Sequence, residues 1–158
     1  NYNGFSADSL PQAYPFVLFD KKEPAADLDW QPQVVVIALG TNDFSTALNP
    51  AERWKTREDL HADYEKTYVA FVQHLRAKYP NAFFILAAPD LSGGEIQQEV
   101  RKVIDQLKAA HETRLALAAF NQLELTACDW HPSLNDDKKM AQSIIDVIDQ
   151  QKEVWVKK

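Results

Sequence analysis

The sequence predicts an α/β fold, a three-layer α/β/α sandwich built around a parallel sheet. Three apolar runs with the length of buried strands lie at 34–39, 82–88 and 114–120. Each run is followed by a segment whose apolar residues recur every three to four positions, which is the spacing of an amphipathic helix. Strands that alternate with helices pair in parallel through right-handed crossovers, so helices cover the faces of the sheet.

The first strand has the clearest signal. Residues 1–32 predict only one short helix, from Pro11 to Phe19. The β-branched run from Val34 to Leu39 predicts a strand buried on both faces, and Gly40 ends it. A long loop over 40–55 follows.

Residues that typically start or end helices and strands bound the next two elements. Thr56 begins the helix and Pro80 ends it. The second strand runs from Ala82 to Ala88 and is stopped by Pro89. The apolar stripe of the helix consists of Leu60, Tyr64, Tyr68, Phe71, Val72, Leu75 and Tyr79.

The pattern then repeats. Ser92 and Glu95 have the spacing of a capping box at the start of a helix. The third strand spans Arg114 to Phe120, a loop covers 121–134, and an amphipathic helix closes the chain. The apolar stripes of these two helices are Ile96, Val100, Val103, Ile104 and Leu107, then Met140, Ile144, Ile145 and Ile148.

Composition fits a single compact domain of 158 residues, 46% hydrophobic and 25% charged. The net charge of −6 argues against nucleic acid or an anionic membrane as a partner, since both demand clustered Lys and Arg. No apolar run reaches the roughly 18 residues of a membrane span. The start at Asn1, without a methionine, suggests a processed or incomplete product. The lone Cys128 cannot form a disulfide within this chain.

Two polar motifs follow predicted strands, Gly40-Thr41-Asn42-Asp43 and Asp129-Trp130-His131-Pro132. The loops after parallel strands gather at one edge of the sheet, where ligands bind in open α/β folds. A histidine titrates in the range that a general base needs, and Pro132 restricts His131 to extended backbone. A fixed amide such as that of Asn42 can stabilise an oxyanion. The alternatives are a surface histidine beside a turn, and a motif at 40–43 that only shapes a turn.

The two motifs resemble the third and fifth sequence blocks of the SGNH (GDSL-type) hydrolases, serine esterases with a flavodoxin-like sheet. The segments Val34 to Ser45 and Cys128 to Ala141 are most similar to the carbohydrate esterase family 2 branch, which is acetyl xylan esterase-like. The opening Asn1 to Gly4 resembles a stretch between the second and third blocks of that branch. By this resemblance His131 would be the base and Asn42 an oxyanion donor.

The resemblance implies secreted or cell-surface enzymes that remove acetyl groups from plant polysaccharides such as xylan and glucomannan, without metal or organic cofactor. Residues 1–158 would be the C-terminal part of the catalytic domain, lacking the first strands. The nucleophilic serine would lie outside this chain, which would be inactive alone. The expected partners are an acetylated polysaccharide or oligosaccharide and the missing N-terminal segment.

One departure concerns the orientation of His131. The family's fifth block usually places Asp three positions before the histidine, where this chain has Cys128. In an extended segment Asp129 would share a face with His131 and could orient it, but a backbone carbonyl could serve instead. Trp130 is either a wall for a sugar ring or a packing aromatic, and Asp43 is a further candidate for substrate binding. Cys128 is expected to be a buried, inert thiol.

Other polar residues are expected to have no catalytic role. Ser9 lacks a preceding strand, and Ser45 and Ser92 do not lie on a nucleophile elbow. The side chains of His61, His74 and His111 are expected to be solvated, with a metal site at His61 and Glu65 disfavoured. Three functions remain open at this point: a carbohydrate deacetylase, an SGNH lipase or thioesterase that acts on acyl lipids, and a non-catalytic carbohydrate-binding domain.

Overall fold

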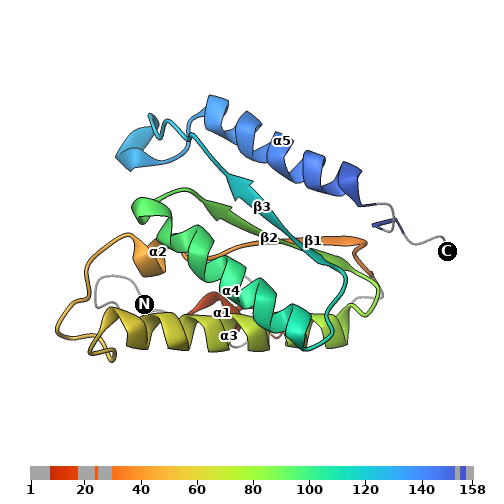
Figure 1. Ribbon diagram of the computed structural model, residues 1–158, viewed down its shortest axis with the longest axis horizontal. Helices are drawn as coiled ribbons and strands as arrows, with labels where there is room; N and C mark the ends of the chain where they lie inside the picture. The colour runs from red at the N-terminus through yellow and green to blue at the C-terminus, as the bar shows by residue number, and fades with distance from the viewer. Residues whose placement is uncertain (1–7, 18–23, 25–29, 152–153, 156–158) are drawn as a thin grey trace.

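Three parallel strands form the sheet of the computed structural model, which describes residues 8–17, 24, 30–151 and 154–155 (Figure 1). They are β1 (Val34–Ala38), β2 (Phe83–Pro89) and β3 (Leu115–Phe120), in the order β1-β2-β3. The register pairs Val34 with Phe83 and Phe84 with Leu115. The predicted parallel sheet is confirmed, with each strand within one residue of its predicted bounds.

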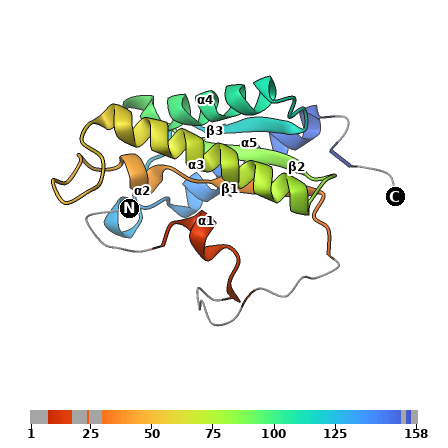
Figure 2. The same cartoon turned by 90° about the horizontal axis from the view of Figure 1, so that it is seen from below.

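Helices cover both faces of this sheet, which confirms the three-layer fold. The helices α3 (Arg57–Lys78) and α4 (Glu95–Ala109) lie on one face, and α5 (Leu134–Gln150) lies on the other (Figures 1 and 2). Alternation along β2 divides the core accordingly, because successive side chains point to opposite faces. Phe84, Leu86 and Ala88 pack with α3 and α4, whereas Phe83, Ile85 and Ala87 pack toward α5.

The prediction that the first strand is buried on both faces is wrong. Within β1 only Ile37 is fully buried, while Val36 is 44% exposed and Ala38 is exposed. The physical reason is position, since β1 is at the edge of the described sheet and α5 packs mainly over β3. A run of β-branched residues is the same in a central strand and in an edge strand, so the sequence could not distinguish them.

The first helix is shorter than predicted, and the long loop after β1 contains helical structure. The helix α1 spans only Leu10–Ala13, because Pro15 has no N–H with which to continue it. Phe16 instead forms an isolated bridge with Pro24, and the end of the predicted helix at Phe19 lies outside the described residues. In the loop predicted over 40–55, the helix α2 occupies Thr41–Phe44.

The helix starts were predicted with mixed success. Thr56 caps α3 as expected, through a capping box with Asp59. The capping box predicted at Ser92 is wrong: Ser92–Gly94 is a 3-10 turn, η2, and α4 begins at Glu95 after Gly94. The hydroxyl of Ser92 donates to the carbonyl of Phe44 instead, at 3.0 Å. No helix in the described part of the chain is long and apolar enough to cross a bilayer.

Candidate active site

Both sequence motifs lie at the edge of the sheet where the strands end. The first forms the turn α2 after β1, and the second forms η3 (Cys128–Trp130) and the residues after it. Figures 1 and 2 show α2 and the loop after β3 at the same end of the sheet, where the strand arrows point. The topology therefore places two segments that are almost ninety residues apart in the sequence at the same end of the sheet.

The turn that carries Asn42 is packed closely against α3 at its start. Gly40 has a φ of 117°, and a Cβ there would lie 2.8 Å from the Tyr64 hydroxyl oxygen. That hydroxyl donates to the carbonyl of Leu39 at 2.9 Å, so it holds the end of β1 against the helix. Burial raises the pKa of Tyr64, and the hydroxyl therefore keeps its proton and remains a donor.

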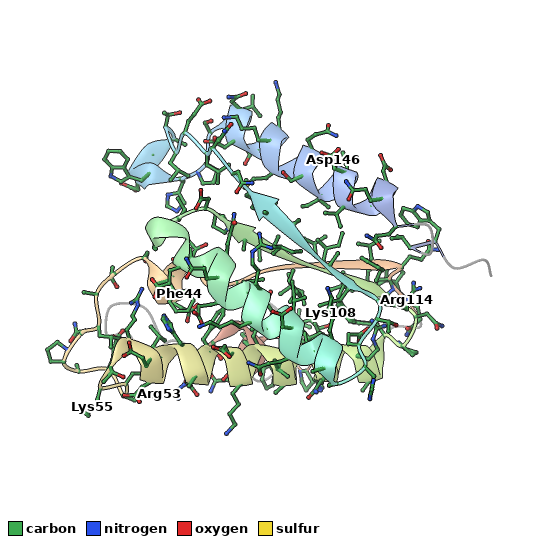
Figure 3. The ribbon with its side chains drawn as sticks, viewed as in Figure 1. Phe44, Arg53, Lys55, Lys108, Arg114 and Asp146 are labelled. Carbon is green, nitrogen blue, oxygen red and sulfur yellow. The ribbon has the colours of Figure 1, made fainter. Side chains whose placement is uncertain are left out.

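The same turn presents Asn42 to solvent and buries its last residue. The side chain of Phe44 is 2% exposed and makes edge contacts with the rings of Tyr64 and His61. Figure 3 shows Phe44 beside the first half of α3. Asn42 is exposed and Asp43 is half-buried. The buried ring of Phe44 therefore fixes the turn against α3, while the side-chain amide of Asn42, two residues earlier, stays accessible to solvent.

His131 is held in one tautomer by the loop after β3. Its backbone is extended, with φ −82° and ψ 163°, as the proline after it predicts. The Nδ1 atom lies 3.0 Å from the carbonyl oxygen of Cys128, and a carbonyl can only accept, so Nδ1–H is the donor. In the neutral ring the proton is then on Nδ1, which leaves the lone pair on Nε2 as the base.

The geometry favours the backbone carbonyl over Asp129 as the group that orients His131. Asp129 has a φ of 53° within the 3-10 turn, so the extended segment that would place it on the same face as His131 is absent. The physical reason is that three residues form a tight turn here, which points the Cys128 carbonyl back at the imidazole. The side chain of Trp130 is 85% exposed, so it does not pack within this chain, and Cys128 is exposed rather than buried as expected.

Asp136 fixes the loop that carries His131, and sequence reasoning missed it. This carboxylate is fully buried and accepts from the backbone N–H groups of Glu124, Leu125 and Ser133 at 2.7, 3.0 and 2.8 Å. These hydrogen bonds, the one from Glu124 first, lower the pKa of Asp136 to about 2. The signal was present in the sequence, since Ser133 and Asp136 have capping-box spacing at the start of α5.

The expectation that His61 is solvated is wrong. Its Nε2 atom lies 2.6 Å from a carboxylate oxygen of Glu95, and its side chain is 21% exposed. The two residues come from different helices, α3 and α4, so no spacing along the sequence signals the pair. Glu65, the other residue of the disfavoured metal pair, contacts Gln106 and Lys102. Among the residues that the structure describes, no group of three or more His, Cys, Asp or Glu side chains could hold a metal ion.

The serines that the sequence analysis set aside have other roles in the structure. The Ser9 hydroxyl donates to the side chain of Gln12 at the start of α1, and Ser92 donates to Phe44. Ser45 is the exposed C-cap of α2. Ser92 lies in the short connection between the buried strand β2 and α4, where a nucleophile elbow would lie, but its hydroxyl is engaged by the Phe44 carbonyl. Ser9 and Ser45 do not lie directly between a strand and a helix.

Comparisons with known proteins identify the family of this chain. The sequence model of the GDSL-like Lipase/Acylhydrolase family matches residues 4–146. An acetylxylan esterase / glucomannan deacetylase from Cellvibrio japonicus is 48% identical over 98% of this chain and 43% of its own length. A solved carbohydrate esterase, whose active site displays divergent catalytic and non-catalytic binding functions, is 47% identical, with a TM-score of 0.93 over 99% of this chain and 50% of its own.

A third relative is a family two carbohydrate esterase from Clostridium thermocellum, solved in complex with cellohexaose. It is 25% identical, with a TM-score of 0.77 over 98% of this chain and 47% of its own. The chain thus spans about half the length of these relatives. From its sequence, its parallel sheet and these neighbours, the chain belongs to the GDSL-like lipase/acylhydrolase family and is most like the carbohydrate esterases of family two.

Proposed function

We propose that this chain supplies the general base and an oxyanion donor of an esterase that removes O-acetyl groups from plant polysaccharides such as xylan or glucomannan. The observation that carries the proposal is the hydrogen bond from His131 Nδ1 to the Cys128 carbonyl, because it leaves Nε2 as a base at the sheet edge. The name of the Cellvibrio japonicus relative supports the choice of substrate. Since polysaccharides of this kind lie outside cells, the enzyme would act as a secreted or surface protein.

In this proposal the nucleophile is a serine from a segment that is not among the 158 residues. β1 is the outermost strand of the described sheet and its Val36 is 44% exposed, which supports this. Another parallel strand paired with β1 would end at the same edge of the sheet as Asn42 and His131, and its last residue would face the same space. The segment would then complete both the sheet and the site.

The reaction follows from these roles. The serine oxygen attacks the acetyl carbonyl carbon while its proton passes to Nε2 of His131. The negative charge that forms on the carbonyl oxygen is stabilised by the side-chain amide of Asn42. The sugar oxygen leaves with the proton from Nε2, and an acetyl-serine remains. Water then attacks the acetyl-serine, gives its proton to Nε2, and acetate departs as the serine regains a proton.

Trp130 and Asp43 are the proposed contacts to the carbohydrate. The indole of Trp130 is 85% exposed next to His131, and an apolar ring of this kind suits the flat face of a sugar. Asp43 lies one residue after Asn42 and is half-buried. Asp129 is retained as a candidate that could act once the loop meets its upstream partner, although the carbonyl of Cys128 already serves His131 in this structure.

The test measures acetate release from acetylated xylan and from an aryl acetate. We expect the isolated chain to be inactive and the chain joined to its upstream segment to be active. In the longer protein, His131→Ala should lower kcat by about 10²–10⁴-fold, the usual contribution of general acid–base catalysis. His74→Ala is the matched control, because His74 is exposed on α3. Activity of the isolated chain, or full activity of the His131 variant, would refute the proposal.

Assays on the same protein distinguish two other functions from the proposed deacetylase. A non-catalytic carbohydrate-binding role is favoured by the exposure of Trp130 and by the binding functions described for the relative of TM-score 0.93. It predicts that polysaccharide binding persists in His131→Ala and that the parent protein releases no acetate. A lipase or thioesterase would prefer acyl chains longer than about four carbons, which a series of aryl esters measures directly.

A further inference from the structure

A cluster of charged side chains joins α3, α4 and the turn α2. The guanidinium of Arg57 donates to both carboxylate oxygens of Glu95, at 2.7 and 2.6 Å. Its remaining donors reach the carbonyl oxygens of Phe44 at 2.9 Å and Thr46 at 2.8 Å. Planar, forked donors of this kind fix the direction of their partners as well as the distance.

The turn that these contacts hold is too short to be stable by itself. The helix α2 has four residues, and an isolated helix of this length does not form, because nucleation fixes several residues for one hydrogen bond. Its first end is held by Tyr64 through the carbonyl of Leu39. Its last end, the carbonyl of Phe44, accepts from both Arg57 and Ser92. The orientation of the turn is thus decided by contacts from α3 and from Ser92 in η2.

Arg57 itself is kept in place from several sides. Its guanidinium carbon lies 5.3 Å from the centre of the Phe44 ring, and its side chain is 27% exposed. Glu95 is held ionised by the hydrogen bonds from Arg57 first and then from His61, which lower its pKa to about 2. A permanently charged pair that is partly shielded from water makes a stiff support, unlike an exposed ion pair.

We propose that Arg57 is a positioning residue of the esterase site, which aims the side-chain amide of Asn42 by clamping the last turn of α2 to α4. The inference rests on the proposed role of Asn42 as an oxyanion donor. An oxyanion donor acts only within hydrogen-bond distance of the developing charge, and a misplacement of about 1 Å can cost roughly 100-fold in rate. Losing Arg57 therefore lowers kcat by a larger factor than it raises KM, because the proposed sugar contact Trp130 lies outside this turn and only Asp43 lies on it.

The experiment is a double-mutant cycle on the complete esterase, the chain joined to its upstream segment. Arg57→Ala should lower kcat by about 10- to 100-fold, and Asn42→Ala should lower it by about 10²–10³-fold. If Arg57 acts through Asn42, the double variant is no slower than Asn42→Ala alone. Losses that multiply instead would overturn the inference.

Two further variants keep the test decisive. Arg57→Lys retains the positive charge but not the forked guanidinium, so it should fold and give an intermediate loss in kcat. If Arg57→Ala does not fold, Arg57→Lys takes its place in the double-mutant cycle. Arg53→Ala is the matched control, since Arg53 lies in the loop before α3 (Figure 3), pairs with Asp63 and lies over the ring of Trp54. Arg53→Ala should leave kcat unchanged.

Failure of the proposed function gives a different pattern. No acetate release by the parent protein, or full activity of Asn42→Ala, refutes the esterase assignment or the oxyanion role, and the inference on Arg57 falls with it. An active parent protein with a slow Asn42→Ala variant and multiplying losses leaves the esterase intact and refutes the clamp alone. Full activity of both Arg57→Lys and Arg57→Ala would likewise refute the role of Arg57 and leave the esterase assignment intact.

Discussion

Replacing Gly40 with alanine is predicted to destabilise the fold strongly. Two separate costs are visible in the structure. The φ of 117° is a conformation that L residues rarely adopt, and the new Cβ would lie 2.8 Å from the Tyr64 hydroxyl and 3.1 Å from Cγ2 of Ile96. Backbone strain of this kind costs about 1–3 kcal/mol, and overpacking costs about 1–3 kcal/mol. We therefore expect a loss of roughly 2–6 kcal/mol, a large share of the roughly 5–15 kcal/mol by which such domains are stable.

Gly93 provides the control that separates the two costs. It also has a left-handed backbone, with φ 67°, but a Cβ there would meet nothing within 4 Å. Gly93→Ala should thus carry only the backbone term, about 1–2 kcal/mol. Urea unfolding followed by tryptophan fluorescence gives the free energy of unfolding for each variant.

The steric term is tested by removing the atom that collides. Tyr64→Phe deletes the hydroxyl and leaves the Leu39 carbonyl without its donor, which costs about 1–3 kcal/mol. In that background Gly40→Ala should be less costly than in the parent chain, by part of the overpacking term, because the contact with Cγ2 of Ile96 remains. The reasoning is refuted if Gly40→Ala is no more destabilising than Gly93→Ala, or if its cost is the same with and without the Tyr64 hydroxyl.

Three more predictions follow from the charges and the exposed ring at this edge. Because the folded state lowers the pKa of Glu95 to about 2, its stabilising effect is complete above its ordinary value of 4.5 and is lost as the pH falls toward 2. The difference in unfolding free energy between the parent chain and Glu95→Gln should therefore shrink between pH 5 and pH 2.5 in urea titrations, and a constant difference would contradict the assignment. Asp136→Asn keeps the size of the side chain but removes an acceptor, so the loop should loosen, with faster amide hydrogen exchange at Glu124 and unchanged exchange in the strands. In the chain joined to its upstream segment, Trp130→Ala should leave the melting temperature unchanged, since the ring is 85% exposed in this chain. If Trp130 contacts the sugar as proposed, KM for acetylated oligosaccharide rises about threefold to tenfold, or roughly 0.7–1.4 kcal/mol, and the aryl acetate rate stays constant.

The fold was predictable because its signals are local. Apolar runs of strand length at 34–39, 82–88 and 114–120, each followed by a helical apolar stripe, were sufficient for the parallel sheet and its layers. The start of α3 at Thr56 was also predicted, and the cap that Thr56 forms with Asp59 is local in the sequence. The capping box expected at Ser92 failed because the hydroxyl had a better partner in Phe44, 48 residues away in the sequence.

The sequence likewise predicts some features of the candidate site and not others. The positions of Asn42 and His131 after strands, and the extended backbone of His131 before Pro132, follow from the sequence and are present in the structure. The orientation of the imidazole was not predictable, because it depends on a left-handed residue, Asp129, inside a short turn. The roles of Arg57 and Glu95 were not predictable either, since they come from two helices whose relative position no local pattern specifies.

The sequence by itself determined which segments are strands and helices, that the strands are parallel, and that both motifs lie at the same edge of the sheet. These features depend on periodicity and on the handedness of crossovers. Only the tertiary structure decided that the Cys128 carbonyl holds His131, that His61 is paired with Glu95, and that Val36 in β1 is exposed. The physical reason is range: hydrophobic periodicity acts over a few residues along the chain, whereas a hydrogen bond or an ion pair forms between whichever groups packing brings within about 3 Å.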